Sequence, residues 1–166
     1  MAKIRFKGLE EYTAKLSQLS VLAEEQALGP AIYDGAAVVM EAVKEELRAV
    51  PTDDRRFVPS SSGLMRLGPT TEQKEQLLES YGVAPMQVDE KGFLNVKVGV
   101  GADYNSIVSK RWPKGQPNLL VARAIESGTS FMEAHPFVKE AVRKSRKAAE
   151  AAMAKRVESE IEKIMK

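Results

Sequence analysis

The stretch Pro85–Gly101, PMQVDEKGFLNVKVGVG, decides the fold class of this chain. Met86 and Val88 lead into a turn that contains Asp89 and Gly92. After the turn, every second position is apolar, namely Leu94, Val96, Val98 and Val100. A period of two on either side of a polar turn is typical of paired antiparallel strands. The stretch therefore predicts a β-hairpin in a chain whose other patterns are mostly helical.

Helical spacing precedes the hairpin. Gly29-Pro30 breaks the chain, and proline suits the first turn of a helix because its missing N–H is not needed there. Apolar residues then recur three and four apart from Ile32 to Leu47, and Pro51 disfavours helix in the residue before it. The spacing predicts a helix over 30–50. A shorter helix is predicted in TTEQKEQLLESYG, residues 70–82, ending at Gly82.

Two more helices are predicted after the hairpin. Asn118 can cap a helix that carries Leu119, Leu120, Ala122 and Ile125, and Gly128 can end it. The last helix begins at Pro136, and its apolar stripe consists of Val138, Val142, Ala149, Met153, Val157, Ile161 and Ile164. A helix of about 30 residues spans about 45 Å, which is longer than a domain of this size is wide. We therefore expect part of it to project.

The order of these elements predicts an α+β fold with a small antiparallel sheet, packed helices and a long C-terminal helix. A short strand at Lys3–Lys7 and a helix at Leu9–Leu19 begin the chain. Residues 1–135 are expected to form the core domain, with long loops at about 50–70 and 105–117. Residues 136–166 are expected to form a helix of the same domain that projects in part for assembly.

Composition excludes several kinds of chemistry. The chain has 166 residues, 43% of them apolar, which suits one domain with a real core. It has no cysteine, so disulfides, thiolate catalysis and cysteine-based zinc sites are excluded. A net charge of 25 − 23 = +2 gives no global argument for a nucleic-acid partner. No apolar run of about 18 residues and no signal-peptide pattern is present, so no membrane partner is expected.

His135 is the only histidine and the first candidate for catalysis or metal binding. Glu133 and His135 are two residues apart, which is not the i, i+4 spacing of a helical zinc pair, and Ser127 does not lie in a G-x-S-x-G motif. We therefore expect His135 to lie in the turn that enters the last helix, and we predict no enzyme, no metal and no cofactor. A small hydrolase that uses His135 is the alternative.

Two other polar stretches receive structural interpretations. The run Asp53-Asp54-Arg55-Arg56 is predicted to be a solvated charge run, because adjacent side chains in a loop diverge. The stretch Gly99–Asp103, GVGAD, lacks the lysine and the remaining glycines of a phosphate-binding P-loop. It is therefore interpreted as a strand end before a turn.

Several apolar residues are candidates for a subunit interface. Trp112, flanked by Arg111 and Pro113, either folds back onto the core or is kept for a partner. Phe131 and Met132 lie in a loop and either fill the core or anchor a neighbouring subunit. At the end of the last helix, Val157, Ile161 and Ile164 form an apolar stripe that usually finds a partner.

A basic cluster stands out in an otherwise balanced chain. Residues 139–147 hold five basic side chains and one acid, Glu140, for a local charge of +4. Lys139, Arg143, Arg146 and Lys147 lie at i, i+4, i+7 and i+8, which is one helical face. Such a face can be solvated surface, or it can meet phosphates. No aromatic residue interleaves with it, so base stacking is not implied.

Several stretches, in order, resemble the tail-component family of long-tailed bacteriophages, whose members are called head–tail joining or tail-completion proteins. They are GLEEYTAKLSQL, AIYDGAAVVMEAVKEEL, SSGLMR, VKVGVGADYNSIV and IESGTSFMEAHPFVKEAV. The last is similar to the family's Glu-x-Gly-Thr, small loop, Pro-Phe and final helix, here Glu126, Gly128, Thr129, Pro136 and Phe137. Between Tyr104 and Glu126 the chain carries an insertion that departs from the family pattern.

The resemblance implies a non-enzymatic virion protein of the phage neck. Members of the family would form a ring, expected to be a hexamer, that completes the tail and joins it to the head. Its partners would be other copies of itself, the adjacent neck and tail proteins, and genomic DNA passing unread through the lumen. Assembly would take place in the host cytoplasm, with the basic face toward the DNA. The alternative is a nucleic-acid-binding regulatory protein that uses the face at 139–147, and it predicts tight, salt-sensitive binding by the monomer.

Overall fold

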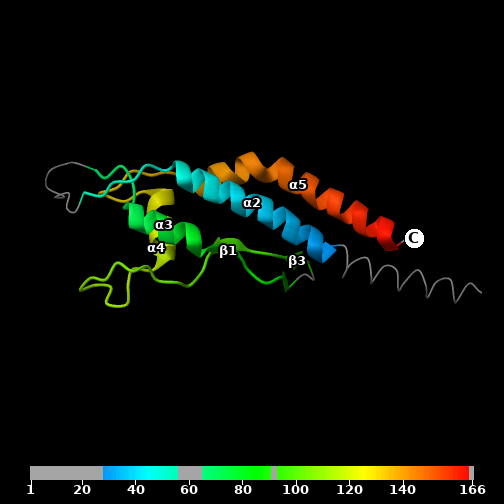
Figure 1. Ribbon diagram of the computed structural model, residues 1–166, viewed down its shortest axis with the longest axis horizontal. Coiled ribbons are helices and arrows are strands. Elements are labelled where there is room, and N and C mark those ends of the chain that lie inside the picture. Colours follow the sequence, from blue (N-terminus) through cyan, green and yellow to red (C-terminus); the bar gives the residue numbers. More distant parts are fainter. Residues whose placement is uncertain (1–27, 56–64, 91–92, 165–166) are drawn as a thin grey trace, which may run out of the picture.

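The computed structural model describes residues 28–55, 65–90 and 93–164, with side chains as far as Lys163. Within these ranges, helices pack against a short antiparallel hairpin, so the predicted α+β class is confirmed (Figure 1). The predicted strand Lys3–Lys7, the helix Leu9–Leu19 and the turn residue Gly92 lie outside the described residues. None of the described helices has a stretch both long and apolar enough to cross a bilayer.

Two antiparallel helices form one layer of the molecule. Helix α2 (Gly29–Ala49) has Pro30 in its first turn and ends before Pro51, as predicted. Helix α5 (Phe137–Ile164) lies along it (Figure 1). Ion pairs join them at both ends, Lys144 with Glu46 at 2.5 Å and Arg156 with Asp34 at 3.8 Å. Because Asp34 lies close to the start of α2, only about the last one or two turns of α5 extend past it. The part of α5 that extends past the described start of α2 is therefore short.

The face that α5 buries coincides only in part with the predicted stripe. Its buried positions are four residues apart, at Phe137, Ala141, Ser145 and Ala149, whereas Val142 is 47% exposed. The small side chains at the last three of these positions let the two helices approach closely. A Cβ built on Gly35 of α2 would lie 2.6 Å from Cγ of Met153, so the contact there requires glycine. Ala149 of the predicted stripe is buried and Val138 packs against the core, so apolar spacing located this face in part. It missed Ala141 and Ser145, because a close helix contact selects for small residues as well as for apolar ones.

The hairpin consists of two short antiparallel ladders. Strand β1 (Tyr81–Val83) pairs with β4 (Val98–Val100), with Tyr81 opposite Val100. Farther along the hairpin, β2 (Gln87–Val88) pairs with β3 (Leu94–Asn95). The predicted hairpin is thus confirmed, and it begins earlier than Met86. The expected end of the preceding helix at Gly82 is wrong by two residues, because Tyr81 is already paired in the sheet.

Two short helices complete the second layer. Helix α3 (Thr71–Ser80) starts with a capping box between Thr70 and Gln73. Helix α4 (Asn118–Ser127) ends at Gly128, as predicted. Its cap residue is Pro117, so the predicted capping role of Asn118 is wrong. The backbone N–H of Asn118 donates to the carbonyl of Asp103 at 3.0 Å, and its side chain is 2% exposed.

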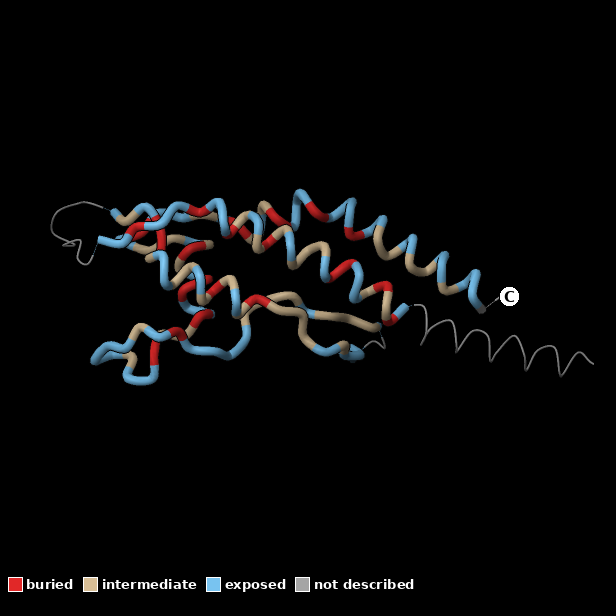
Figure 2. Tube along the Cα trace, viewed as in Figure 1, coloured by how far each residue is buried: buried red, intermediate tan, exposed pale blue. Residues whose placement is uncertain are grey.

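The core lies where α2, α5, α3, α4 and β1 meet (Figure 2). Leu47, Leu77 and Ile125 are fully buried there. The rings of Tyr81 and Phe137 pack edge to face, with centroids 6.1 Å apart. Met132 also belongs to this cluster and is 6% exposed. Of its two predicted alternatives, core filling is therefore confirmed and the proposed interface role is wrong.

Candidate functional site

The turn at His135 is a joint between α4 and α5. The backbone N–H of His135 donates to the carbonyl of Ile125 at 2.7 Å, and its Nε2 lies 2.5 Å from the carbonyl oxygen of Leu67. Since a carbonyl can only accept, Nε2 carries the proton. The carboxylate of Glu126 accepts from the N–H groups of Val138 and Lys139, at 2.8 and 3.2 Å. It thereby caps α5 from a neighbouring helix.

The other residues of this motif are also used in the joint. Gly128 has φ +70° and ψ 175°, a region open almost only to glycine. Oγ1 of Thr129 accepts from the N–H of Phe131 at 3.3 Å, and its backbone pairs with Met132. Burial raises the pKa of Tyr81, beside Phe137, to about 12, and the charge of Glu126 contributes to this rise. The prediction that this stretch forms the entry turn of the last helix is confirmed.

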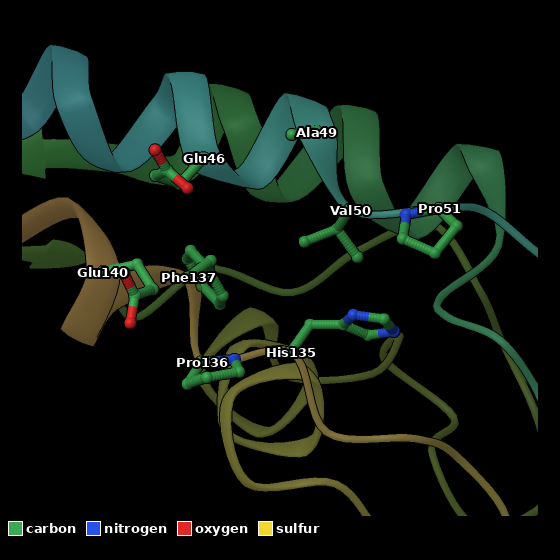
Figure 3. A pocket seen from close by; sticks show the side chains of 8 residues that line it. All are labelled: Glu46, Ala49, Val50, Pro51, His135, Pro136, Phe137 and Glu140. Carbon is green, nitrogen blue, oxygen red and sulfur yellow. The ribbon is translucent and has the colours of Figure 1, made fainter.

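A small apolar pocket lies beside the joint (Figure 3). Its volume is about 200 Å³, and it is lined by Glu46, Ala49, Val50, Pro51, His135, Pro136, Phe137 and Glu140. The imidazole lies on the Pro51 side, and the two carboxylates lie on the other side of Phe137 (Figure 3). Glu46 pairs with Lys144 and Glu140 with Arg143, so neither is hydrogen-bonded to His135. Across residues 28–55, 65–90 and 93–164, no group of three acidic or histidine side chains is placed to hold a metal ion.

The acids at 53 and 54 form what we call a clasp, because both accept hydrogen bonds from later parts of the chain. Asp53 is 6% exposed and accepts hydrogen bonds from the N–H of Leu67 at 3.1 Å and from Nε of Arg55 at 2.7 Å. The hydrogen bond from the Arg55 side chain is the main reason that the pKa of Asp53 is well below its usual value. Asp54 accepts from the backbone N–H and the hydroxyl of Thr71, both at 2.7 Å. The prediction is therefore wrong for Asp53, which is buried and also accepts from a residue 14 positions away. Asp54 is exposed, as predicted, although it is hydrogen-bonded to Thr71, 17 positions away.

The outer side of α3 is acidic. Glu72, Glu75 and Glu79 are exposed and lie opposite the buried Leu77, and together they form what we call the acidic face. Lys74, the one basic residue of α3, turns away from this face. Its Nζ donates to the carbonyls of Arg48 and Val50 at the end of α2, both at 2.7 Å.

A polar cavity of about 520 Å³ adjoins the acidic face. It lies between α3, the segment 103–106 and the start of α4, and is lined by Gln76, Glu79, Ser80, Asp103, Tyr104, Asn105, Ser106 and Asn118. Asn105 and Asn118 are 3% and 2% exposed. Nδ2 of Asn105 and Oδ1 of Asn118 are buried without a hydrogen-bond partner among the described residues. No sequence motif predicted this cavity, since its lining comes from three separate segments.

The predicted basic face is present on the outside of α5. Lys139, Arg143, Arg146 and Lys147 are all exposed, and they lie on the side of the helix away from Ala141 and Ser145, which face α2. We call these four residues the basic face. Arg143 pairs with Glu140 at 2.7 Å, and this hydrogen bond holds the pKa of Glu140 below its ordinary value. Arg146 pairs with Glu150 at 3.0 Å.

The remaining interface candidates do not form one surface. Phe131 is 52% exposed at the tip of the 129–132 turn. Its backbone carbonyl accepts from the N–H of Arg66, which brings it beside two exposed residues that the sequence did not single out, Met65 and Leu67. Trp112 is half-buried in the predicted loop at 105–117, with the Arg111 guanidinium 5.5 Å from its ring centroid.

The candidates at the end of α5 are separate from that tip. Val157 is half-buried, Ile161 is 40% exposed, and the side chain of Ile164 lies outside the described residues. The interface role of these three residues therefore stays a prediction.

Comparison with known proteins gives no relative. No model of a protein family, no curated protein and no solved structure matches this chain.

Proposed function

We propose that this protein is a structural subunit of the neck of a long-tailed bacteriophage, where copies form a ring that completes the tail and joins it to the head. The proposal starts from the motifs of this chain, which resemble those of that family and follow one another in the same order. In the structure, the proposal is supported by the role of the most specific of these motifs, whose residues stabilise the fold. Glu126, Gly128, Thr129 and Phe137 are all occupied in capping, turning and core packing. Such use suits a protein whose task is to hold a shape.

The surface of the described residues also suits assembly. Large apolar side chains are exposed in separate places, at Met65, Leu67 and Phe131 at the loop tip and at Leu119 and Leu120 on α4. Contacts in several directions are what a subunit needs when it touches neighbours on both sides and rings above and below. We propose a hexamer as the ring, with other neck and tail proteins as further partners, in the virion.

The predicted contact of the basic face with DNA in the lumen receives only partial support. The four residues are exposed, but Arg143 and Arg146 already share carboxylates on their own helix. An exposed intrahelical pair is weak, of the order of 0.5 kcal/mol, so phosphates could still displace it. The regulatory alternative uses the same surface and would require the free subunit to bind nucleic acid tightly.

Self-assembly and DNA binding separate the two functions. Negative-stain electron microscopy and sedimentation velocity of the purified protein should show closed rings of uniform size. Fluorescence anisotropy with a labelled duplex should show weak binding at about 0.15 M salt. A protein that stays monomeric at every concentration and binds the duplex at nanomolar levels, with a steep salt slope, would support the regulatory alternative.

A further inference from the structure

We propose that the acidic face of α3 in one copy binds the basic face of α5 in the next copy. The inference rests on the proposed ring and names the surfaces by which neighbouring subunits would meet. The contact is one of unlike patches, so it would be heterologous, which is the kind of contact that generates rings.

The acidic face is open to a cationic partner. Among the ion pairs of the described residues, none involves Glu72, Glu75, Glu79 or Asp103. Within the described part of the chain, Glu72 accepts hydrogen bonds from neutral groups, namely the hydroxyl of Ser106 and the amide of Gln76. Three carboxylates on one helix repel each other. A neighbouring basic surface would relieve this repulsion.

The polar cavity beside the acidic face supplies an independent sign of a ligand. Oδ1 of Asn118 is a buried acceptor without a donor, and a buried polar group without a partner costs free energy. Ammonium and guanidinium groups carry only donors and suit this atom and the nearby carboxylates of Glu79 and Asp103. Nδ2 of Asn105 needs an acceptor, which a carboxylate such as Glu140 on α5 can supply. The cavity thus suits a partner surface that carries long basic side chains next to a carboxylate.

The two faces are placed for a head-to-tail contact. Helix α2 lies between α5 and α3 and packs against both, and α5 and α3 lie on opposite sides of it (Figure 1). Both faces also lie toward the same end of α2. Lys144 of α5 pairs with Glu46, and Lys74 of α3 contacts the carbonyls of Arg48 and Val50. A copy can therefore present its basic face to one neighbour and its acidic face to the other.

Charge balance favours this partner over DNA. A chain with a net charge of +2 that carries a basic patch also carries nearly the same amount of acid. Three of these acids, Glu72, Glu75 and Glu79, are gathered on the acidic face, and every copy carries one acidic face and one basic face. The contact would be formed by exposed groups, so it should weaken as salt rises above about 0.15 M.

Reciprocal charge reversal tests the contact. One double variant, Glu75→Lys with Glu79→Lys, makes the acidic face basic, and another, Arg143→Glu with Lys147→Glu, makes the basic face acidic. Self-association of each variant alone, measured by sedimentation velocity, should be about 30-fold weaker, which corresponds to about 2 kcal/mol for two exposed pairs turned from attraction to repulsion. Mixed one to one, the variants should assemble, because in an alternating ring the two unchanged faces meet each other and the two reversed faces meet each other, each time with opposite charge.

Matched controls change the same charge elsewhere. Glu41→Lys with Glu45→Lys reverses two exposed acids, also four apart, on α2. Lys97→Glu with Lys155→Glu does the same for two exposed bases. These controls should assemble within about threefold of the wild type.

The outcomes separate this inference from the proposed function. A wild type that forms rings while both face variants also form them overturns the contact alone. The same holds if the mixture fails to restore assembly, or if the Arg143→Glu, Lys147→Glu variant assembles normally and loses only duplex binding. A wild type that never assembles overturns the ring, and this contact with it.

Discussion

Replacing Gly128 with alanine should destabilise the protein by about 3 kcal/mol. The residue ends α4 at φ +70° and ψ 175°, and this part of conformational space costs a residue with a Cβ about 1–3 kcal/mol. The added Cβ would lie 3.0 Å from both the nitrogen and the Cβ of Ala134. Overpacking of this kind adds about 1–3 kcal/mol, and the stiffer unfolded chain returns about 0.4–1 kcal/mol.

The effect should be measurable in two ways. Urea unfolding followed by circular dichroism should give a lower midpoint with an unchanged slope. For a chain of this length, 3 kcal/mol should lower Tm by about 6–12 °C. Gly82→Ala is the matched control, since a Cβ there meets nothing within 4 Å and the φ of Gly82 is not positive. If Gly128→Ala costs no more than Gly82→Ala, the account of the joint is wrong.

Three further predictions concern the same framework. Glu126→Ala should cost about 1 kcal/mol because α5 loses its cap at Val138 and Lys139, and Glu126→Gln should cost less because the amide oxygen still accepts; equal losses would count against capping. The pKa of Asp53 is lowered in the folded protein, so the stabilisation by its carboxylate is present above about pH 4 and is lost as the pH falls further. Asp53→Asn should therefore lower the free energy of unfolding at pH 7 and flatten this part of the acid-unfolding curve. An unchanged curve would show that the hydrogen bonds of Asp53 do not stabilise the fold. Truncation after Lys155 removes Arg156, which pairs with Asp34, and should leave a folded subunit with impaired ring formation; normal rings in electron micrographs would show that the end of α5 is not needed.

Regular elements were predictable where their signal was local. Pro30 and Pro51 bracket α2, Gly128 ends α4, and the alternation from Leu94 to Val100 marks the return half of the hairpin. The entry turn at His135 was also predictable, because Gly128 and Pro136 limit the backbone on either side. The four residues of the basic face could be placed on one side of α5 from their spacing alone.

Features that depend on distant partners were not predictable. Asp53 and Asp54 were predicted to be solvated charges, and their donors Leu67 and Thr71 lie 14 and 17 residues farther along the chain. Asn118 appeared to be a cap, but it is buried beside a cavity built from three segments.

By itself, the sequence determined the α+β class, the approximate bounds of the helices and the charges carried by each helix. Only the tertiary structure decided which side of α5 is buried, that Met132 belongs to the core, and that the acidic and basic faces lie on opposite sides of α2. The physical reason is the range of the interactions. Backbone preferences and helical spacing act over a few residues. Burial, ion pairing and the relation between two surfaces depend on how elements far apart in the chain pack together.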